Sequence, residues 1–394
     1  MAELLPIEEA RARVLDSIAP LGAEEVELDA ALGRVLAERV VSDLDVPPFD
    51  CSAMDGFAVP EGAAGELRLI GEARAGHPFA ATVEPGTAVR ISTGAPLPSG
   101  AAAVVPVERC EGEGEGFVRL PAASPGANVR RAGEDVPARK TVLGPGAELE
   151  AAELGVLASL GRSRVRCALR PRVAVLVTGD ELAPPGAELR PGQIFSSNAY
   201  ALAAQVARAG GELRQREHVP DDPGATRTAL AGALGGADVV CVSGGVSVGP
   251  HDHVKGALAE LGIEEVFWGI RLKPGKPTWF GRREQTLVFG LPGNPVSAMV
   301  TFQLLVRPAL RRLQGARPEP RLEAMLGAPI ERNAGREQAV RVRLESAADG
   351  LYAYSTGAQG SHVLTSMLAA DGLALIPSGE GTLAAGEHVE VEPL

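Results

Sequence analysis

Apolar residues along this chain follow two different spacings, and the changes between them divide the sequence into regions. Residues 6–18 place their apolar side chains on one helical stripe after a proline suited to a helix start, which predicts an N-terminal helix. Residues 47–139 instead hold short apolar runs broken by Gly and Pro, which predicts a small β-rich unit. Helical spacing returns at 146–161. We therefore predict that the β-rich unit is inserted into a domain whose two halves are 1–49 and 140–170.

Strands and helices alternate from residue 171 onward. A continuous apolar run at 171–178 is followed by a helical pattern that begins at Asn198, as a cap, and stops at Gly210 and Gly211. Further apolar runs alternate with helical segments up to Leu310, which is typical of a mostly parallel sheet covered by helices on both faces. Short strands with turn residues then predict a C-terminal β-barrel. The predicted fold is a multidomain α/β protein, with 1–49 plus 140–170 as an elongated N-terminal domain, 50–139 as the inserted β-rich domain, 171–317 as a three-layer α/β domain and 318–394 as the barrel.

The composition narrows the function classes. Lysine and arginine number 38 against 50 aspartates and glutamates, and the net charge of −12 argues against a nucleic-acid binder with a broad basic face. No uncharged apolar run is long enough for a membrane span, and Glu3, Glu8 and Glu9 stand where a signal peptide would carry basic residues. We therefore expect a cytoplasmic protein with no membrane partner and no nucleic-acid partner.

The cysteine pattern argues against two kinds of site. Cys51, Cys110, Cys167 and Cys241 are isolated, and they form no CxxC pair. This spacing predicts free thiols rather than a structural zinc site or a disulfide framework.

Unusual turns follow the predicted strands of the α/β domain. In open α/β sheets, ligands bind at the carboxyl ends of the strands, so these turns are expected to meet in one crevice. Each turn alone is also typical of an ordinary solvated loop, and it is their convergence that indicates a site. The turns read TGDEL at 178–182, VPDD at 219–222, SGGVSVGPHDH at 243–253, KPGKP at 273–277 and LPGNP at 291–295.

The residue types in these turns predict an anion site. Gly244 and Gly245 let the backbone approach a phosphate closely, and Asn294 with Pro295 predicts a helix start that points its free N–H groups at the ligand. Two lysines in KPGKP add ammonium groups. The carboxylates of the other turns would repel an anion unless a Mg²⁺ ion stands between them. His251 and His253, two residues apart in a loop, are more typical of solvated side chains than of metal ligands.

The same turns resemble the MoeA family of molybdopterin molybdenumtransferases, which includes the E domain of gephyrin. The resemblance extends over nearly the whole chain and in the family's order. One departure is Pro250-His251-Asp252-His253, where the family commonly has Glu-Ala-Asp-Tyr. Beyond the turns above, the matching segments are PPFDCSAMDGFAV at 47–59, RISTGAPLPSGAAAVVPVE at 90–108, NVRRAGEDV at 128–136 and GAQGSHVLTSM at 357–367.

The resemblance implies a homodimer of elongated four-domain subunits whose active site is shared between subunits. It implies a MogA-like central domain and a reaction that inserts molybdate into the dithiolene of adenylylated molybdopterin, with release of AMP. It also implies a Mg²⁺ ion held by Glu181 and Asp252, and contact with the molybdopterin adenylyltransferase that supplies the substrate. The catalytic residues it implies are Asp55, Thr93, Asp135, Glu181, Asp221 and Asp252, and the expected substrate contacts are Gly244, Gly245, Ser247, Lys273, Lys276, Pro292, Asn294, Pro295 and Ser361.

The sequence is also compatible with two other functions. TGDEL and GGVSVG also fit the smaller MogA-type adenylyltransferases, which transfer AMP to molybdopterin. A non-catalytic scaffold like gephyrin would need an exposed peptide-binding groove, for which the sequence gives no signal.

Overall fold

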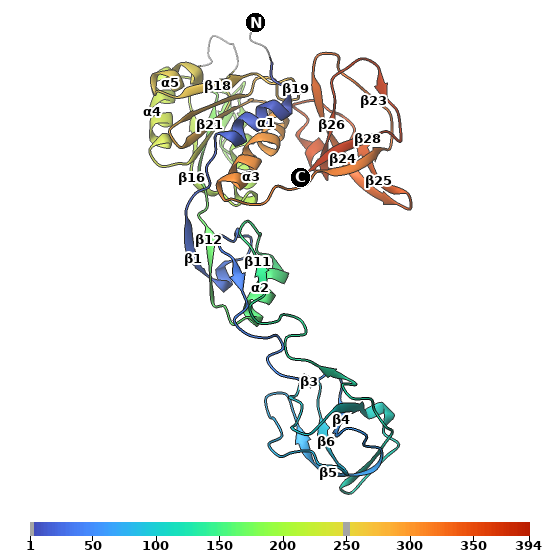
Figure 1. Ribbon diagram of the computed structural model, residues 1–394. Helices are drawn as coiled ribbons and strands as arrows, with labels where there is room; N and C mark the ends of the chain where they lie inside the picture. Colours follow the sequence, from blue (N-terminus) through green and yellow to red (C-terminus); the bar gives the residue numbers. More distant parts are fainter. Residues whose placement is uncertain (1–3, 247–252) are drawn as a thin grey trace.

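The chain is an elongated molecule with its largest mass at one end (Figure 1). The computed structural model describes residues 4–246 and 253–394. The α/β domain and the C-terminal barrel form the head, a narrow middle domain follows, and the inserted β-rich domain lies at the far end. This arrangement confirms the predicted multidomain α/β fold. Within the described residues, no helix is long and apolar enough to cross a membrane.

The inserted domain is built on a six-stranded sheet in the order β7-β4-β6-β5-β9-β8. Apolar side chains are buried on both of its faces, with Phe57 in one cluster and Ile91 in the other. A short strand pair, β3 with β10, joins the sheet to the middle domain. The elements are β3 (Cys51–Ser52), β4 (Gly56–Val59), β5 (Gly65–Ala73), β6 (Thr87–Ile91), β7 (Ala103–Pro106), the 3-10 turn η2 (Val107–Arg109), β8 (Gly112–Gly114), β9 (Phe117–Leu120) and β10 (Val129–Arg130).

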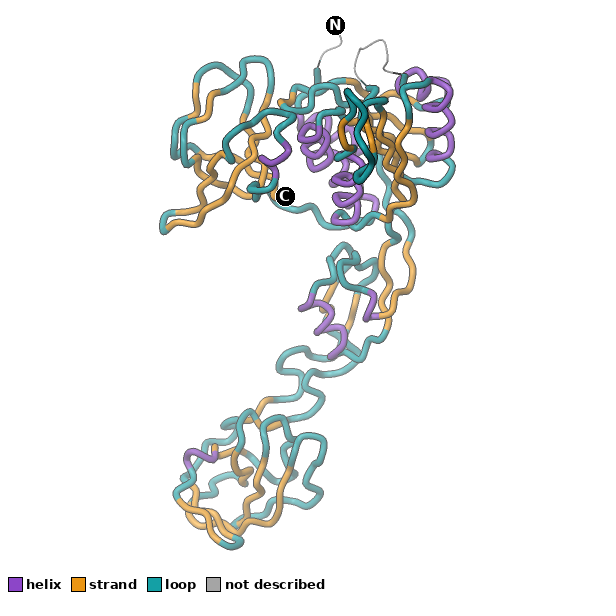
Figure 2. The backbone as a smooth tube through the Cα atoms, turned by 180° about the vertical axis from the view of Figure 1, so that it is seen from behind, coloured by secondary structure: helices purple, strands orange, loops and turns teal. Residues whose placement is uncertain are grey.

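The middle domain is made by two segments far apart in the sequence. Strands β1 and β12 pair antiparallel and run side by side from the head into this domain in both views (Figure 2). Its small core includes Leu36, Leu149 and Leu157, all fully buried. The elements are β1 (Ala23–Glu27), the 3-10 turn η1 (Leu28–Ala30), β2 (Val40–Val41), β11 (Thr141–Leu143), α2 (Ala151–Ser159) and β12 (Arg164–Ala168).

The N-terminal helix α1 (Ile7–Asp16) does not belong to this middle domain, contrary to the prediction that placed it with 140–170. Its buried stripe of Ile7, Ala10 and Val14 joins the core of the α/β domain instead. Helix α1 packs against helix α7 (Arg307–Leu313), whose buried apolar residues belong to the same cluster.

The α/β domain has a six-stranded sheet in the order β16-β13-β17-β21-β20-β18, in which β20 alone runs against its neighbours. Helices α1, α3, α6 and α7 cover one face and α4 and α5 cover the other, which gives three layers. A π-helical turn, Phe302–Val306, links α6 to α7. The elements are β13 (Arg172–Thr178), β14 (Leu182–Ala183), β15 (Ile194–Phe195), α3 (Asn198–Arg208), β16 (Glu212–Val219), α4 (Pro223–Leu234), β17 (Val239–Ser243), α5 (Val254–Glu260), β18 (Glu264–Trp268), β19 (Leu272–Lys273), β20 (Trp279–Arg283), β21 (Thr286–Leu291) and α6 (Pro295–Thr301).

The C-terminal domain is a closed five-stranded barrel, because β24 pairs with both β25 and β26. Strand β19 of the α/β domain adds to the free side of β24. Arg321 also ties the barrel to α1, since it contacts Glu8 at 2.5 Å and Glu390 at 2.8 Å. The elements are β22 (Leu322–Leu326), β23 (Ile330–Glu331), β24 (Glu337–Ala347), β25 (Gly350–Ser355), the 3-10 turn η4 (Leu364–Met367), β26 (Gly372–Ile376), β27 (Thr382–Leu383) and β28 (His388–Pro393).

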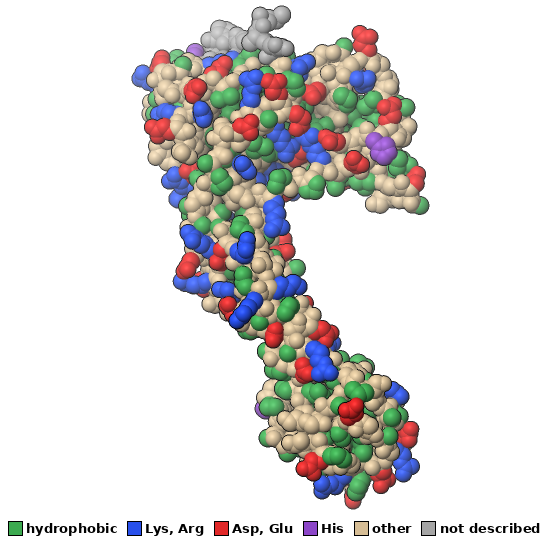
Figure 3. Space-filling view, viewed as in Figure 1, with side chains coloured by type: hydrophobic (Ala, Val, Ile, Leu, Met, Phe, Trp, Pro, Cys, Tyr) green, Lys and Arg blue, Asp and Glu red, His purple; other side chains and the backbone are tan. Residues whose placement is uncertain are grey.

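Charged side chains of both signs are interspersed over the face of the molecule shown in Figure 3. Lysine and arginine side chains do not gather into a broad basic patch on that face.

Candidate functional site

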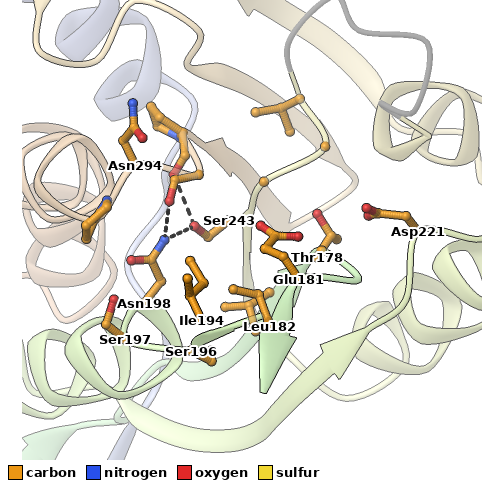
Figure 4. Close-up of a pocket in the computed structure, with 18 of the residues that line it drawn as sticks. Thr178, Glu181, Leu182, Ile194, Ser196, Ser197, Asn198, Asp221, Ser243 and Asn294 are labelled. Atoms are coloured by element: carbon orange, nitrogen blue, oxygen red, sulfur yellow. Dashed lines mark hydrogen bonds between the residues drawn. The ribbon is translucent and has the colours of Figure 1, made fainter. Parts of the chain in front are cut away.

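A cleft of about 690 Å³ opens at the carboxyl edge of the α/β sheet. Its walls come from the turns after β13, β16, β17 and β21, from the segment 194–198, and from His362 of the C-terminal domain (Figure 4). Four of the five unusual turns therefore meet in one place, as the sheet topology predicts, and the fifth reaches the cleft only through Pro277.

The acidic turns after β13 and β16 are joined by reciprocal hydrogen bonds. The Asp180 amide donates to Asp221 Oδ2 at 3.3 Å, and the Asp221 amide donates to Asp180 Oδ1 at 3.1 Å. His218 Nε2 lies 2.7 Å from the carbonyl oxygen of Gly179 and must donate, because a carbonyl only accepts. A Cβ at Gly179 would lie 2.4 Å from Glu181 Oε2, so only glycine lets this carboxylate fold back over the turn. The pairing holds Glu181 and Asp221 in the cleft wall.

The glycine turn after β17 packs tightly against β13. Gly244 has φ +95°, and a Cβ there would lie 2.6 Å from Thr178 Oγ1. Gly245 also has positive φ, at +65°. The backbone of this turn is therefore open to the cleft in a conformation that favours glycine. Ser247 and Asp252, predicted as a substrate contact and a metal ligand, lie outside the described residues.

Asn198 fixes two of the cleft turns to each other, a role that the sequence did not predict. Its Nδ2 donates to Ser243 Oγ and to the carbonyl oxygen of Gly293, both at 2.8 Å, and Ser243 Oγ donates to the carbonyl oxygen of Pro292 at 3.1 Å (Figure 4). The predicted cap is wrong: Asn198 is the first residue of α3 and Ser197 holds the cap position. The Asn198 side-chain amide points into the cleft because its two hydrogen-bond acceptors lie there. To cap the helix, this side chain would instead have to turn toward the backbone of α3.

The start of α6 lies in the cleft, and the C-terminal domain reaches it there. Asn294 occupies the cap position and Pro295 the first helical position, as predicted. The Asn294 side chain makes no cap hydrogen bond and instead donates to Ser361 Oγ at 3.1 Å. The Val296 amide donates to the Ser361 carbonyl at 3.2 Å, and the next residue, His362, lines the cleft. The segment 357–367 thus completes the site from another domain.

Arg341 holds this segment in place from beneath. Its fully buried guanidinium donates from Nε to Ser366 Oγ at 3.2 Å, and from one terminal nitrogen to the carbonyl oxygens of Ala358 at 3.4 Å and Gly360 at 3.2 Å. Burial lowers the pKa of Arg341, and no carboxylate among the described residues offsets that effect.

The lysines of KPGKP are exposed, and neither lines the cleft in this structure. Lys273 instead borders a second cavity of about 320 Å³ between the α/β domain and the barrel, next to Arg341 and Gln359. The turn lies at the expected sheet edge, but it connects β18 to β20 and its strand β19 pairs with β24. Strand β21 lies between β17, which the glycine turn follows, and β20, which the lysine turn precedes. Only Pro277 of the lysine turn borders the cleft.

Asp55, Thr93 and Asp135 lie far from the cleft of the same chain, in the inserted domain and at its junction with the middle domain (Figure 1). Asp55 Oδ1 accepts from the Thr93 amide at 2.6 Å and from Thr93 Oγ1 at 2.9 Å, and these two hydrogen bonds hold the pKa of Asp55 below its usual value. Asp135 borders a cavity of about 490 Å³ with Cys51 and Arg130. The sequence gives no signal for the Asp55–Thr93 contact, because the two residues are distant along the chain.

The carboxylates that line the cleft can supply only some of the ligands that a hard divalent cation needs. The described residues contain no group of three or more His, Cys, Asp or Glu side chains arranged to hold a metal. Glu181 and Asp221 both line the cleft. Mg²⁺ commonly takes one or two protein carboxylates and completes its shell with water and substrate phosphate oxygens, so this donor set is compatible with Mg²⁺.

Three family models match the chain in sequence order. They are the MoeA N-terminal region (domain I and II) at residues 5–161, a probable molybdopterin binding domain at 174–312 and the MoeA C-terminal region (domain IV) at 323–394. The chain is 37% identical to a molybdopterin molybdenumtransferase of Haemophilus influenzae, covering 99% of this chain and 98% of that protein. It is 39% identical to molybdopterin molybdenumtransferase 2 of Mycobacterium tuberculosis, covering 93% and 94% respectively.

Solved structures agree with these relatives over the full length. A molybdopterin biosynthesis MoeA protein from Pyrococcus horikoshii superposes with a TM-score of 0.85 at 32% identity and covers 100% of both chains. A molybdenum cofactor biosynthesis protein from Pyrococcus furiosus, at 23% identity and a TM-score of 0.62, shares the fold.

Proposed function

This chain belongs to the MoeA family, and we propose that it inserts molybdate into the dithiolene of adenylylated molybdopterin and releases AMP. The observation that carries the proposal is the cleft itself, where a glycine turn, a helix start and two carboxylates meet in the segment matched by the molybdopterin binding model. Relatives named molybdopterin molybdenumtransferase that align over nearly the whole chain support the same reaction.

The residue types suit cleavage of a phosphoanhydride. Such a transfer needs positioning and charge neutralisation more than a protein nucleophile. The glycine turn at Gly244 and Gly245, which lines the cleft, offers backbone N–H groups to phosphate oxygens. Molybdenum–sulfur bonds form with the dithiolene of the substrate, so the protein's part is to hold the pterin and molybdate and exclude competing reactions. The family resemblance supports molybdate binding near Ser361, Lys273 and Lys276, which would supply hydroxyl and ammonium donors, although neither lysine lines the cleft in this structure.

Magnesium dependence is a second part of the proposal. Glu181 would hold the ion together with Asp252, and Asp221 lines the cleft beside Glu181. When bound, Mg²⁺ would neutralise phosphate charge that these carboxylates otherwise repel. Excess EDTA should abolish AMP release and added Mg²⁺ should restore it. AMP release at full rate in EDTA would contradict a metal requirement.

We also propose a homodimer with a shared site. Its support is the separation of Asp55, Thr93 and Asp135 from the cleft of their own chain, although the family pattern makes them functional. Mixing inactive Asp55→Ala and inactive Glu181→Ala proteins should restore part of the activity, because some mixed dimers carry one intact site. Each variant mixed with itself is the control. Failure to recover activity after verified subunit exchange would count against sharing.

Two incubations separate the proposed reaction from adenylyl transfer. The protein is supplied either with molybdopterin, Mg²⁺ and ATP or with adenylylated molybdopterin and molybdate. We expect the second mixture to lose the adenylylated pterin and gain AMP, and the first to stay unchanged. Formation of the adenylylated pterin in the first mixture would identify an adenylyltransferase, and no change in either would indicate a non-catalytic protein.

A further inference from the structure

One wall of the cleft carries apolar side chains that remain accessible to solvent. Ile194 lines the cleft and is 56% exposed. It lies on β15, which pairs in parallel with β14, and its register partner is Leu182. Register partners on neighbouring strands project to the same face of the ribbon, and Figure 4 shows both side chains next to each other, near Glu181 and Asn198. We call Leu182 and Ile194 the shelf.

The shelf does not contribute to folding in the way a core residue does. Neither side chain belongs to the two apolar clusters that hold the α/β domain together. An Ile that is more than half exposed gains little of the free energy that burial of its side chain supplies. Solvent-accessible apolar surface in a cleft that also carries polar groups is typical of a ligand-binding wall.

The neighbours of the shelf define what kind of group it can take. Glu181 precedes Leu182 directly, and the Asn198 amide near Ile194 is fixed by its two hydrogen bonds. The glycine turn, which we propose binds phosphate, belongs to the same cleft. A ligand with a flat apolar face linked to phosphates would therefore place the face on the shelf and the phosphates on the turns.

We propose that the shelf binds the flat face of the substrate's nitrogen heterocycle and makes Ile194 a specificity-determining residue. This inference rests on the proposed function, since that function supplies a substrate with a pterin and an adenine joined through phosphates. Both rings share the required chemistry, and the test tells them apart.

The test compares binding of adenylylated molybdopterin and of AMP to the wild type, Ile194→Ala, Ile194→Val and Leu189→Ala. Leu189 is the matched control, because it is 41% exposed on the segment between β14 and β15 and does not line the cleft. Ile194→Ala should weaken binding of adenylylated molybdopterin about 5- to 20-fold, the size expected for loss of one aliphatic contact surface. Ile194→Val should recover most of the affinity, and Leu189→Ala should bind like the wild type.

The outcomes separate this inference from the function on which it depends. If Ile194→Ala weakens both ligands, adenine lies on the shelf; if it weakens only adenylylated molybdopterin, the pterin does, and either result supports the proposal. If the wild type consumes adenylylated molybdopterin and Ile194→Ala binds both ligands normally, the shelf is wrong and the function stands. If the wild type neither binds nor consumes it, both fall.

Discussion

Arg341 offers a sharp test of how the C-terminal domain contributes to the site. Its guanidinium is fully buried under the segment 357–367 and donates to Ser366, Ala358 and Gly360. Replacing it with methionine, Arg341→Met, keeps the aliphatic stem and removes the planar donor group. The segment that presents Ser361 and His362 to the cleft then loses the anchor beneath it.

The structure sets the size of the effect. Three hydrogen bonds at about 1 kcal/mol net each are lost, and part of this is recovered because a buried charge no longer has to be desolvated. The pKa of Arg341, lowered by burial, has the direction expected of that desolvation cost. We expect the segment to open more easily by about 2 kcal/mol, which corresponds to about 30-fold faster amide exchange.

Hydrogen exchange read by mass spectrometry measures this directly on peptides that contain the amides of Val363 and Ser366, both hydrogen-bonded within the segment. Arg343→Met is the matched control, because Arg343 lies two residues along the same strand, is exposed and pairs with Glu345 on the surface. AMP release should fall in Arg341→Met and not in Arg343→Met. Arg341→Lys should not restore it, since one ammonium cannot reach the acceptors that the planar fork spans. Unchanged exchange in Arg341→Met would refute the anchoring role.

Three further predictions concern the α/β domain and its neighbours. Gly244→Ala should abolish most activity while the chain remains folded, because its methyl would lie 2.6 Å from a threonine hydroxyl at a positive φ; near-normal AMP release would contradict the tight turn. Burial raises the pKa of Asp238, but hydrogen bonds and charge from Arg172 outweigh it and leave the pKa below the usual 3.8. The stabilising contribution is therefore present above that pH and lost as the pH falls through the lowered pKa, so the urea midpoint of the wild type should exceed that of Asp238→Asn at pH 7 and approach it in acid. Burial raises the pKa of the Cys241 thiol to about 12, so a thiol reagent at pH 8 should modify the partly exposed Cys110 and leave Cys241 untouched until urea is added.

Local patterns predicted the α/β domain well because its strands and helices are set by nearby residues. The turns after β13, β16, β17 and β21 converge because parallel strands end at one sheet edge, which the alternation of strands and helices already implies. Pro295 marks the start of α6 for an equally local reason, since proline suits a first helical position.

The same local sequence patterns could not predict contacts between segments that are far apart along the chain. The apolar stripe of α1 shows that the helix is buried but does not show which domain buries it. The lysine turn follows a strand as expected, yet β19 pairs with β24 of the barrel and not with a strand of the α/β sheet. Residues near β19 in the sequence do not show this pairing. Asn198 looked like a helix cap because its environment, two loop acceptors contributed from elsewhere, is not visible along the chain.

The central claim is that release of AMP and insertion of molybdenum are one reaction on this protein. The most direct measurement adds molybdate to the protein loaded with adenylylated molybdopterin and Mg²⁺, then quantifies AMP and pterin-bound molybdenum together in a single turnover. We predict that both appear in equal amounts and at the same rate, and that neither appears without molybdate. AMP released at the same rate without molybdate, or without molybdenum entering the pterin, would contradict the account.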